Sequence, residues 1–150
     1  MAGELAAIKG VFLGDEARAA YNTALGAAGL RPLVGLRANR ELLRGAGAWP
    51  LLAVELGDLR GERRGACGLR AWAGRATLIL GLGGPDPDAL VAALPAYLDA
   101  LRAAVDSDLR RSFAFLWPAT AQAEGEAWAA RGVHLRTAEL AYEFVYLYQR

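Results

Sequence analysis

The longest regular pattern in the sequence spans residues 86–105 and sets the main constraint on the fold. Asp86 has a side chain suited to cap a helix, and Pro87 fits the first helical position, where its missing N–H costs nothing. Apolar residues then recur every three or four positions, at Leu90, Leu94, Leu98, Leu101 and Val105. We therefore predict a long helix over 87–105, kinked at Pro95, that buries one face against a second layer.

Strand-like segments precede this helix. Residues 49–56, 66–72 and 77–82 predict an antiparallel meander of three strands, with turns at 57–65 and at Gly74-Arg75. Residues 77–82 are apolar almost throughout, which is typical of a central strand buried on both faces. We expect this third strand to lie in the middle of the sheet.

More strand-like sequence follows the helix. Residues 112–117 predict a strand that ends at Pro118, and Thr120 is suited to cap a short helix that ends at Gly132. Residues 133–148 are strongly β-forming and predict either one strand or a hairpin around Ala138-Glu139.

The first part of the chain predicts one more strand and two helices. The apolar run 5–13 predicts a strand, residues 16–28 a helix capped by Asp15, and residues 38–44 a short helix. Residues 1–150 thus predict a single domain of the α+β class, with a mixed, mostly antiparallel sheet and helices on both faces. The long helix would act as a right-handed crossover that makes strands 77–82 and 112–117 parallel neighbours.

Composition excludes several classes of function. Lys and Arg number 17 against 16 Asp and Glu, and the net charge of +1 argues against a nucleic-acid-binding protein. One Cys (Cys67) and one His (His134) cannot build a thiolate zinc site or a site of several histidines, so we expect no metal. Without a signal-peptide pattern or an apolar run of about 18 residues, we expect a cytoplasmic protein with no membrane contact. The many Ala, Leu, Gly and Arg residues indicate a GC-rich, bacterial genome.

Three segments resemble the GNAT family of acetyl-CoA-dependent N-acetyltransferases. Residues 51–72, LLAVELGDLRGERRGACGLRAW, resemble the family's second and third strands with their polar hairpin. Residues 77–94, TLILGLGGPDPDALVAAL, resemble the strand, pyrophosphate loop and long helix, and residues 125–133, GEAWAARGV, resemble a later helix-to-strand passage. The resemblance implies transfer of an acetyl group from acetyl-CoA to an amine, with the coenzyme's pyrophosphate held at Leu82, Gly83 and Gly84.

The coenzyme loop departs from the family pattern. No Arg or Gln precedes the glycines, and two acids, Asp86 and Asp88, follow in the first helical turn. Their charge would repel a pyrophosphate, and a capping carboxylate already satisfies the helix N-terminus. We therefore expect weak or absent binding of acetyl-CoA.

The catalytic positions that the resemblance implies are also altered. Where family members often carry a Tyr that acts as a general acid, this sequence has Trp128, whose indole does not deliver a proton at neutral pH. Glu55 is the candidate general base, acting through water. The alternative is that Glu55 is a half-exposed partner in a salt bridge.

Two stripes of aromatic residues remain to be explained. Alternation along strands places Phe113, Phe115 and Trp117 on one face, and a second stripe on another: Leu140, Tyr142, Phe144, Tyr146 and Tyr148. Such stripes form core, a ligand cleft or a subunit interface. We expect a homodimer that uses the C-terminal aromatic surface near Tyr142, Tyr146 and Tyr148.

Two functions from different classes fit these observations. One is a GNAT-like N-acyltransferase with an unknown amine acceptor. The other is a non-catalytic domain of the same fold that serves binding or assembly. The altered loop and Trp128 favour the second, whereas the abundance of enzymes in the family favours the first.

Overall fold

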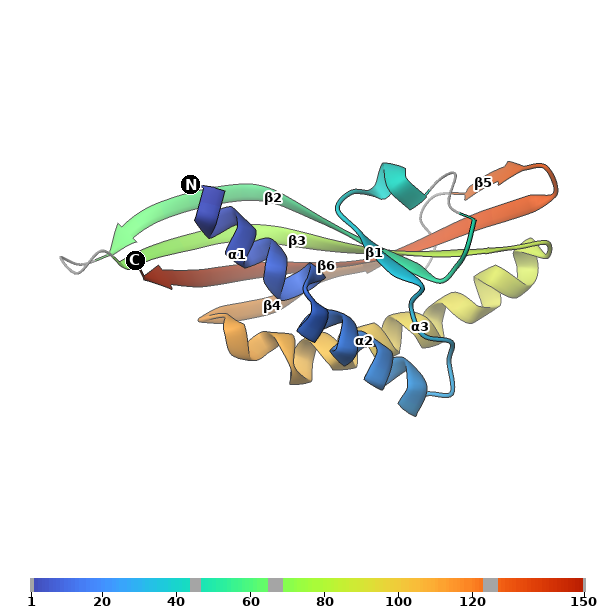
Figure 1. The fold of residues 1–150 in the computed structure, drawn as a ribbon, viewed down its shortest axis with the longest axis horizontal. Helices are drawn as coiled ribbons and strands as arrows, with labels where there is room; N and C mark the ends of the chain where they lie inside the picture. Colours follow the sequence, from blue (N-terminus) through green and yellow to red (C-terminus); the bar gives the residue numbers. More distant parts are fainter. Residues whose placement is uncertain (1, 44–46, 65–68, 123–126, 150) are drawn as a thin grey trace.

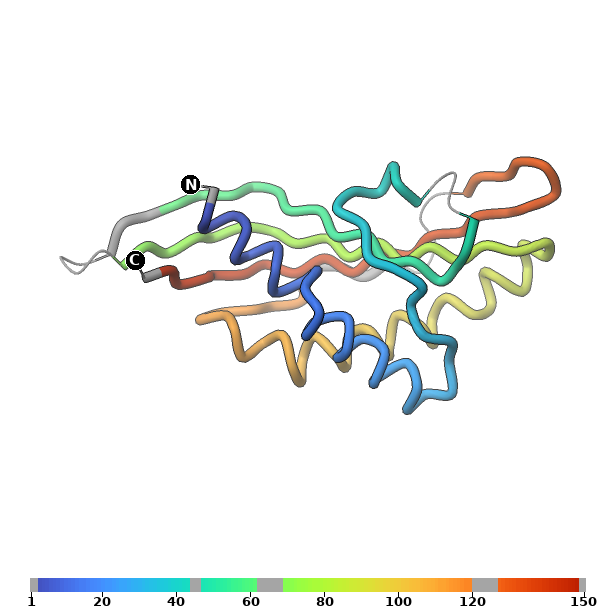
Figure 2. Tube along the Cα trace, viewed as in Figure 1, coloured from blue at the N-terminus to red at the C-terminus, as the bar shows by residue number. Residues whose placement is uncertain are grey.

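The computed structural model describes residues 2–43, 47–64, 69–122 and 127–149, in which helices pack along one twisted sheet (Figure 1). The helices are α1 (Ala2–Leu13), α2 (Asp15–Ala27) and α3 (Pro87–Ser107), with the short 3-10 helices η1 (Arg40–Leu43) and η2 (Leu109–Ser112). The strands are β1 (Gly35–Arg37), β2 (Leu51–Arg64), β3 (Leu69–Gly84), β4 (Phe115–Gln122), β5 (Ala127–Ala130) and β6 (Val133–Gln149). The start of α1 and the end of β6 lie at the same end of the sheet (Figure 2).

The sheet has the strand order β1-β2-β3-β6-β4, and β5 pairs with the beginning of β6. β1 runs parallel to β2, and the other pairings in the described part of the chain are antiparallel. This topology confirms the α+β class and the mixed, mostly antiparallel sheet. β3 lies between β2 and β6, so the prediction of a central strand at residues 77–82 is also confirmed.

The α3 helix forms as its sequence pattern predicts. The side chain of Asp86 accepts hydrogen bonds from the backbone N–H groups of Asp88 and Ala89, and Pro87 occupies the first turn. Four members of the apolar stripe are buried and Leu90 is partly buried; the buried ones are Leu94, Leu98, Leu101 and Val105. Through this stripe α3 packs on β3 and β6.

The described α-helices share one face of the sheet, which corrects the expectation of helices on both faces. Phe12 of α1, Tyr21 of α2 and Leu98 of α3 belong to one buried cluster with residues of β2, β3 and β6. On the opposite face a smaller cluster centres on Leu43 of η1 and Ile79 of β3. This cluster covers only part of that face. Among the described residues, α-helices therefore cover one side of the sheet, and the small cluster around η1 covers part of the other.

β3 is much longer than the predicted strands, whereas β6 follows the one-strand alternative for residues 133–148 and not the hairpin. They are continuous over 16 and 17 residues, so Gly74-Arg75 and Ala138-Glu139 lie inside strands and form no turns. The predicted polar turn at 57–65 is instead largely strand: β2 continues to Arg64 through an irregularity between Gly57 and Arg60, where Asp58 has φ of 53°. Each neighbouring strand satisfies the backbone N–H and C=O groups of alternate residues. At these positions this pairing outweighs the local preference for a turn. Cys67 lies outside the described residues.

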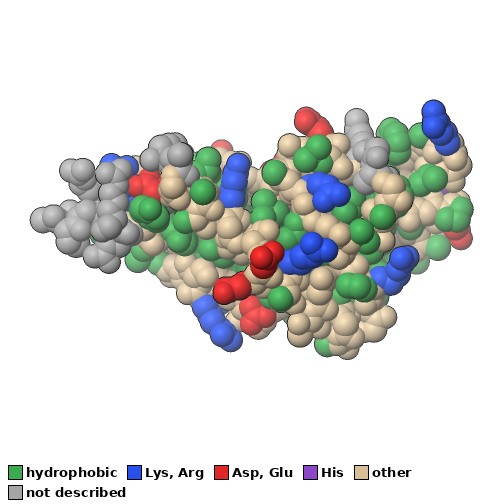
Figure 3. Space-filling view, viewed as in Figure 1, with side chains coloured by type: hydrophobic (Ala, Val, Ile, Leu, Met, Phe, Trp, Pro, Cys, Tyr) green, Lys and Arg blue, Asp and Glu red, His purple; other side chains and the backbone are tan. Residues whose placement is uncertain are grey.

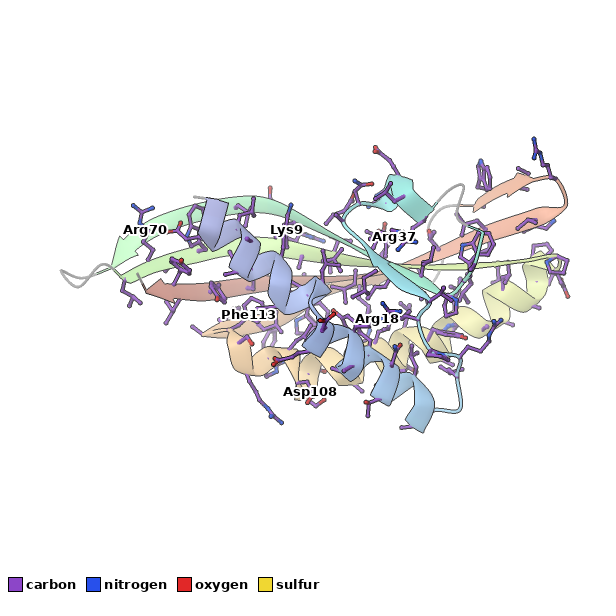
Figure 4. The ribbon with its side chains drawn as sticks, viewed as in Figure 1. Lys9, Arg18, Arg37, Arg70, Asp108 and Phe113 are labelled. Atoms are coloured by element: carbon purple, nitrogen blue, oxygen red, sulfur yellow. The ribbon has the colours of Figure 1, made fainter. Side chains whose placement is uncertain are left out.

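The predicted first strand is a helix. Ile8 and Phe12 are buried at a spacing of four, the period of one helix face. Glu4, which is only 2% exposed, lies one turn earlier in α1. One of its carboxylate oxygens is 3.7 Å from the guanidinium of Arg70. Figure 4 shows Arg70 near the beginning of α1. A short apolar run does not distinguish strand from helix, and here the spacing of Ile8 and Phe12 was the better guide. α2 follows as predicted, although Gly14 occupies the cap position and Asp15 the first turn.

The region after α3 differs most from expectation. β4 continues past Pro118 to Gln122, and Ala127–Ala130 form β5, so the predicted helix between Thr120 and Gly132 is wrong. β3 and β4 run in the same direction but are not neighbours, because β6 lies between them. The predicted pair of parallel neighbours is therefore corrected, and the chain places β4 at the edge of the sheet.

Candidate functional site

The three residues that the resemblance assigns to the coenzyme loop lie inside β3. Leu82, Gly83 and Gly84 continue the ladder with β6, opposite Arg136, Leu135 and His134. Gly83 packs closely, because a Cβ atom there would overlap the indole ring of Trp49. This segment is regular paired strand, whereas a phosphate cradle needs backbone N–H groups that converge on open space.

The N-terminus of α3 next to these glycines is already capped. The carboxylate of Asp86 accepts from the N–H of Asp88 at 3.1 Å and from the N–H of Ala89 at 3.5 Å. These are donors that an anion at a helix N-terminus would use. The negative charge expected from the sequence is thus in place at the position where a pyrophosphate would have to bind.

Glu55 is held in a salt bridge on the face opposite the α-helices. Its carboxylate accepts from Arg40 Nε at 3.0 Å and from the Arg40 backbone N–H at 3.1 Å. The same guanidinium contacts Glu139 at 2.9 Å. The hydrogen bond to Glu55 raises the pKa of Arg40 above its usual range. The geometry therefore agrees with the alternative that Glu55 is a half-exposed partner in a salt bridge.

Trp128, the counterpart of the family's general acid, lies in β5 and not on a helix. It packs against the small cluster around Leu43 and Leu135, on the same side of the sheet as Trp49. The resemblance implied a helix-to-strand passage at residues 125–133, but in the structure Trp128 and Gly83 lie opposite Leu135 on the two strands that flank β6. Trp49 and Trp128 thus cover part of the face opposite the α-helices.

The C-terminal tyrosines face the helices, which corrects the expectation of an exposed tyrosine surface. Tyr142 is 1% exposed, and burial raises its pKa to about 12, helped by Asp106 and opposed by Arg102 and Arg110. Tyr146 and Tyr148 are partly buried against the main core. These side chains lie on the side of β6 that α1 and α3 cover, so they act mainly as core residues.

The exposed aromatic residues lie on β4 instead. Phe115 is 48% exposed and Trp117 is 59% exposed, and their rings stack with centroids 6.3 Å apart and an interplanar angle of 12°. Phe113, expected on the same face, precedes β4 and turns into the core, where its ring lies 5.4 Å from that of Phe144. The expectation that all three side chains share one face is correct for Phe115 and Trp117 and wrong for Phe113.

These two rings belong to a larger uncovered area that we call the open face. It is formed by the outward-facing residues of β2, β3, β6 and β4 at the end of the sheet away from η1: Arg60, Ala73, Arg75, Glu143, Val145, Leu147, Phe115 and Trp117. Leu147 is also exposed, by 43%. In register, one row across the strands reads Arg60, Ala73, Val145, Phe115, and the next reads Gly57, Arg75, Glu143, Trp117.

A hollow of about 260 Å³ lies within the open face. Its walls combine Asp58, Arg60, Arg75 and Glu143 with the ring of Phe115. Two positive and two negative side chains thus border an apolar floor at Ala73 and Gly74. Such a mixture suits a polypeptide surface that carries both signs of charge more than a small anion.

A second, larger groove lies between α1, α2 and η2. Its volume is about 670 Å³, and small side chains of α1 and α2, such as Ala7, Gly10 and Ala20, form much of its wall. At its rim Asp108 pairs with Arg111 at 3.8 Å. On the face in view, charged and apolar side chains are interspersed over the helices and the sheet (Figure 3). The described residues that line this groove do not form a recognisable catalytic or ligand-binding set.

The edges of the sheet are protected from strand addition. On β4 the carbonyl of Leu116 accepts from Arg110 at 2.9 Å, and Pro118 has no N–H to donate. On the other side, β1 covers β2 only at residues 51–53, and the rest of β2 carries the irregularity at Asp58 and several charges. Proline, charges and bulges of this kind disfavour edge-to-edge pairing.

Among the described residues, no group of three or more His, Cys, Asp or Glu is placed to hold a metal ion. Likewise, none of the helices in that part of the chain has the length and apolar character needed to cross a membrane. No protein-family model matches the chain, and its sequence matches no curated protein.

Proposed function

We propose that this chain is a non-catalytic assembly domain, which associates with a second copy of itself through the open face. The observation that carries the proposal is the stacked pair Phe115 and Trp117, each about half exposed on an edge strand. Large aromatic side chains rarely remain exposed together on a monomer, and they are enriched at interfaces.

The distribution of the helices supports the same conclusion. The described α-helices pack on the other side of the sheet, and η1 covers only the far end of this side. The two rings leave roughly 200 Å² of largely apolar surface in water. Covering that area would contribute up to about 5 kcal/mol per copy before the costs of association.

The open face is small compared with the interface of a stable dimer. Four strands spaced by about 4.8 Å and about five residues long project an area of roughly 350 Å². Stable dimers bury about 800 Å² of accessible surface per partner, so this smaller footprint fits a weak, reversible interface. We expect a concentration-dependent dimer with a dissociation constant between about 1 and 100 µM.

The experiment compares two pairs of substitutions by light scattering after size exclusion. Phe115→Ser with Trp117→Ser should shift the mass at a few hundred micromolar from dimer to monomer. Val34→Ser with Leu42→Ser removes two other exposed apolar side chains, 46% and 50% exposed, and should leave the dimer intact. A monomeric unmodified protein, or equal masses for both variants, would contradict the proposal.

A further inference from the structure

We infer that the two copies stack sheet on sheet about a two-fold axis parallel to the strands, with Arg75 of each copy facing the partner's Glu143. This inference rests on the proposed self-association through the open face and adds its register. The residues that set the register are Arg75 and Glu143, which lie directly opposite each other on the adjacent central strands β3 and β6.

The register follows from the order of the strands across the open face. The face is four strands wide, in the order β2, β3, β6, β4, and its midline runs between β3 and β6. A two-fold axis along this midline places β3 over the partner's β6 and β2 over the partner's β4. Sheets that pack face to face in this way keep their strands nearly aligned, about 10 Å apart.

Opposite charges then meet at the centre of the interface. Arg75 and Glu143 of one copy, together with the same pair of the second copy, form a square in which the signs alternate. Each charge keeps an opposite charge beside it in its own sheet and gains another across the interface. Charges of this kind set register and exclude other partners more than they add affinity.

The aromatic residues fit the same arrangement. The row that contains Trp117 also contains Gly57, and the row that contains Phe115 also contains Arg60. With β4 over the partner's β2, the two rings cover Gly57, which has no side chain, and Arg60 at the margin of the hollow. An arginine over an aromatic face contributes a favourable cation–π contact.

The other two-fold arrangement is disfavoured by charge. An axis in the plane of the interface but perpendicular to the strands places β3 over β3 and β6 over β6. Arg75 would then approach its own copy on β3, and Glu143 its own copy on β6. Like charges brought together across an interface oppose association. The charge pattern therefore selects the arrangement in which β3 covers β6.

The test is a charge reversal divided between two chains. Arg75→Glu alone places two acids opposite each other, and Glu143→Arg alone places two bases opposite each other. Each single variant should weaken self-association at least about tenfold. When the two variants are mixed, every contact across the interface again joins opposite charges. The mixture should form a heterodimer with an affinity within about threefold of the unmodified dimer, as measured by sedimentation with one chain fluorescently labelled.

Circular dichroism melting of each single variant checks that the chain still folds. The double variant Arg75→Glu, Glu143→Arg keeps the pair within each sheet and should form a homodimer if a single variant fails to fold. If the unmodified protein dimerises through Phe115 and Trp117 but the mixture gains nothing over the single variants, the register is wrong while the proposed function stands. If the unmodified protein is monomeric, the proposed function itself is wrong.

Discussion

Tyr142 and Tyr21 show how two buried hydroxyls of one core differ. The Tyr21 hydroxyl donates to the Phe12 carbonyl at 2.9 Å. The hydroxyl of Tyr142 makes no hydrogen bond of good geometry among the described residues, although the guanidinium of Arg102 lies close enough to lower its pKa. A buried polar group without a partner is costly, whereas a paired one contributes about 1 kcal/mol. The sequence showed a tyrosine stripe on β6, but which hydroxyls find partners depends on contacts between distant segments.

Replacing each tyrosine by phenylalanine should separate the two cases. We expect Tyr21→Phe to lower the free energy of unfolding by about 1 kcal/mol at neutral pH, because a buried carbonyl loses its donor. Tyr142→Phe should leave it unchanged or raise it by up to about 1 kcal/mol. Urea unfolding at a fixed protein concentration measures both. A loss above about 1 kcal/mol for Tyr142→Phe would show that its hydroxyl is paired.

The same tyrosine predicts a loss of stability in alkali. Burial raises the pKa of Tyr142 to about 12 in the folded protein, against 10.0 for the free side chain. The folded state therefore favours the protonated phenol, and this contribution is complete below pH 10 and declines as the pH rises toward 12. At pH 11 the unmodified protein should have lost about 1 kcal/mol more than Tyr142→Phe, relative to neutral pH. Equal losses in urea titrations of the two proteins would contradict this.

At the scale of elements, the sequence predicted helices and central strands better than their ends. α3 and β3 were located because their patterns are long and consistent with one structure. The length of β3 was not predictable, and one strand and a hairpin both stayed open for residues 133–148, since Gly74 and Ala138 resemble breaks until a neighbouring strand pairs with them. The order of β6 between β3 and β4 is a tertiary choice that local patterns do not contain.

The buried stripe of α3 gives the element its stability. Leu94 is fully buried between α3 and the sheet. Leu94→Ala should lower the free energy of unfolding by roughly 2–5 kcal/mol, since it removes packed methyl groups and leaves a cavity. Ala96→Ser, on an exposed position of the same helix, is a matched control and should change it by less than about 0.5 kcal/mol. Chemical denaturation measures both, and a loss below about 0.5 kcal/mol for Leu94→Ala would place this face outside the core.

The junction of β3 and α3 also tests the resemblance to acetyltransferases. Asp86 occupies the helix N-terminus, and Gly83 and Gly84 are paired to β6. We therefore expect millimolar acetyl-CoA to leave the melting temperature unchanged. Asp86→Asn with Asp88→Asn keeps a cap and removes two charges, and should bind acetyl-CoA more strongly than the unmodified protein if the charges alone prevent binding. A micromolar site in the unmodified protein, measured by calorimetry, would favour the acetyltransferase instead.

The site was only partly predictable from sequence. The aromatic stripes indicated an interface, and the net charge of +1 argued against nucleic acid. Which stripe reaches solvent depends on which face the helices cover: α1 and α3 cover Tyr142, whereas Trp117 is left exposed. The sequence also misplaced Gly83 and Gly84 in a loop, because their pairing to β6 makes them strand residues.

At the scale of the whole molecule, the account rests on a sheet with two unequal faces. One face is covered by helices and the other ends in the open face, with both edges of the sheet protected against strand addition. We propose that a second copy of the chain covers Phe115 and Trp117.

Sedimentation equilibrium of the unmodified protein between about 1 and 300 µM tests this account most directly. We predict a reversible increase in mass from one chain to two, with a midpoint between about 1 and 100 µM. A mass of one chain over the whole range, or an increase that continues past two chains without a plateau, would contradict it.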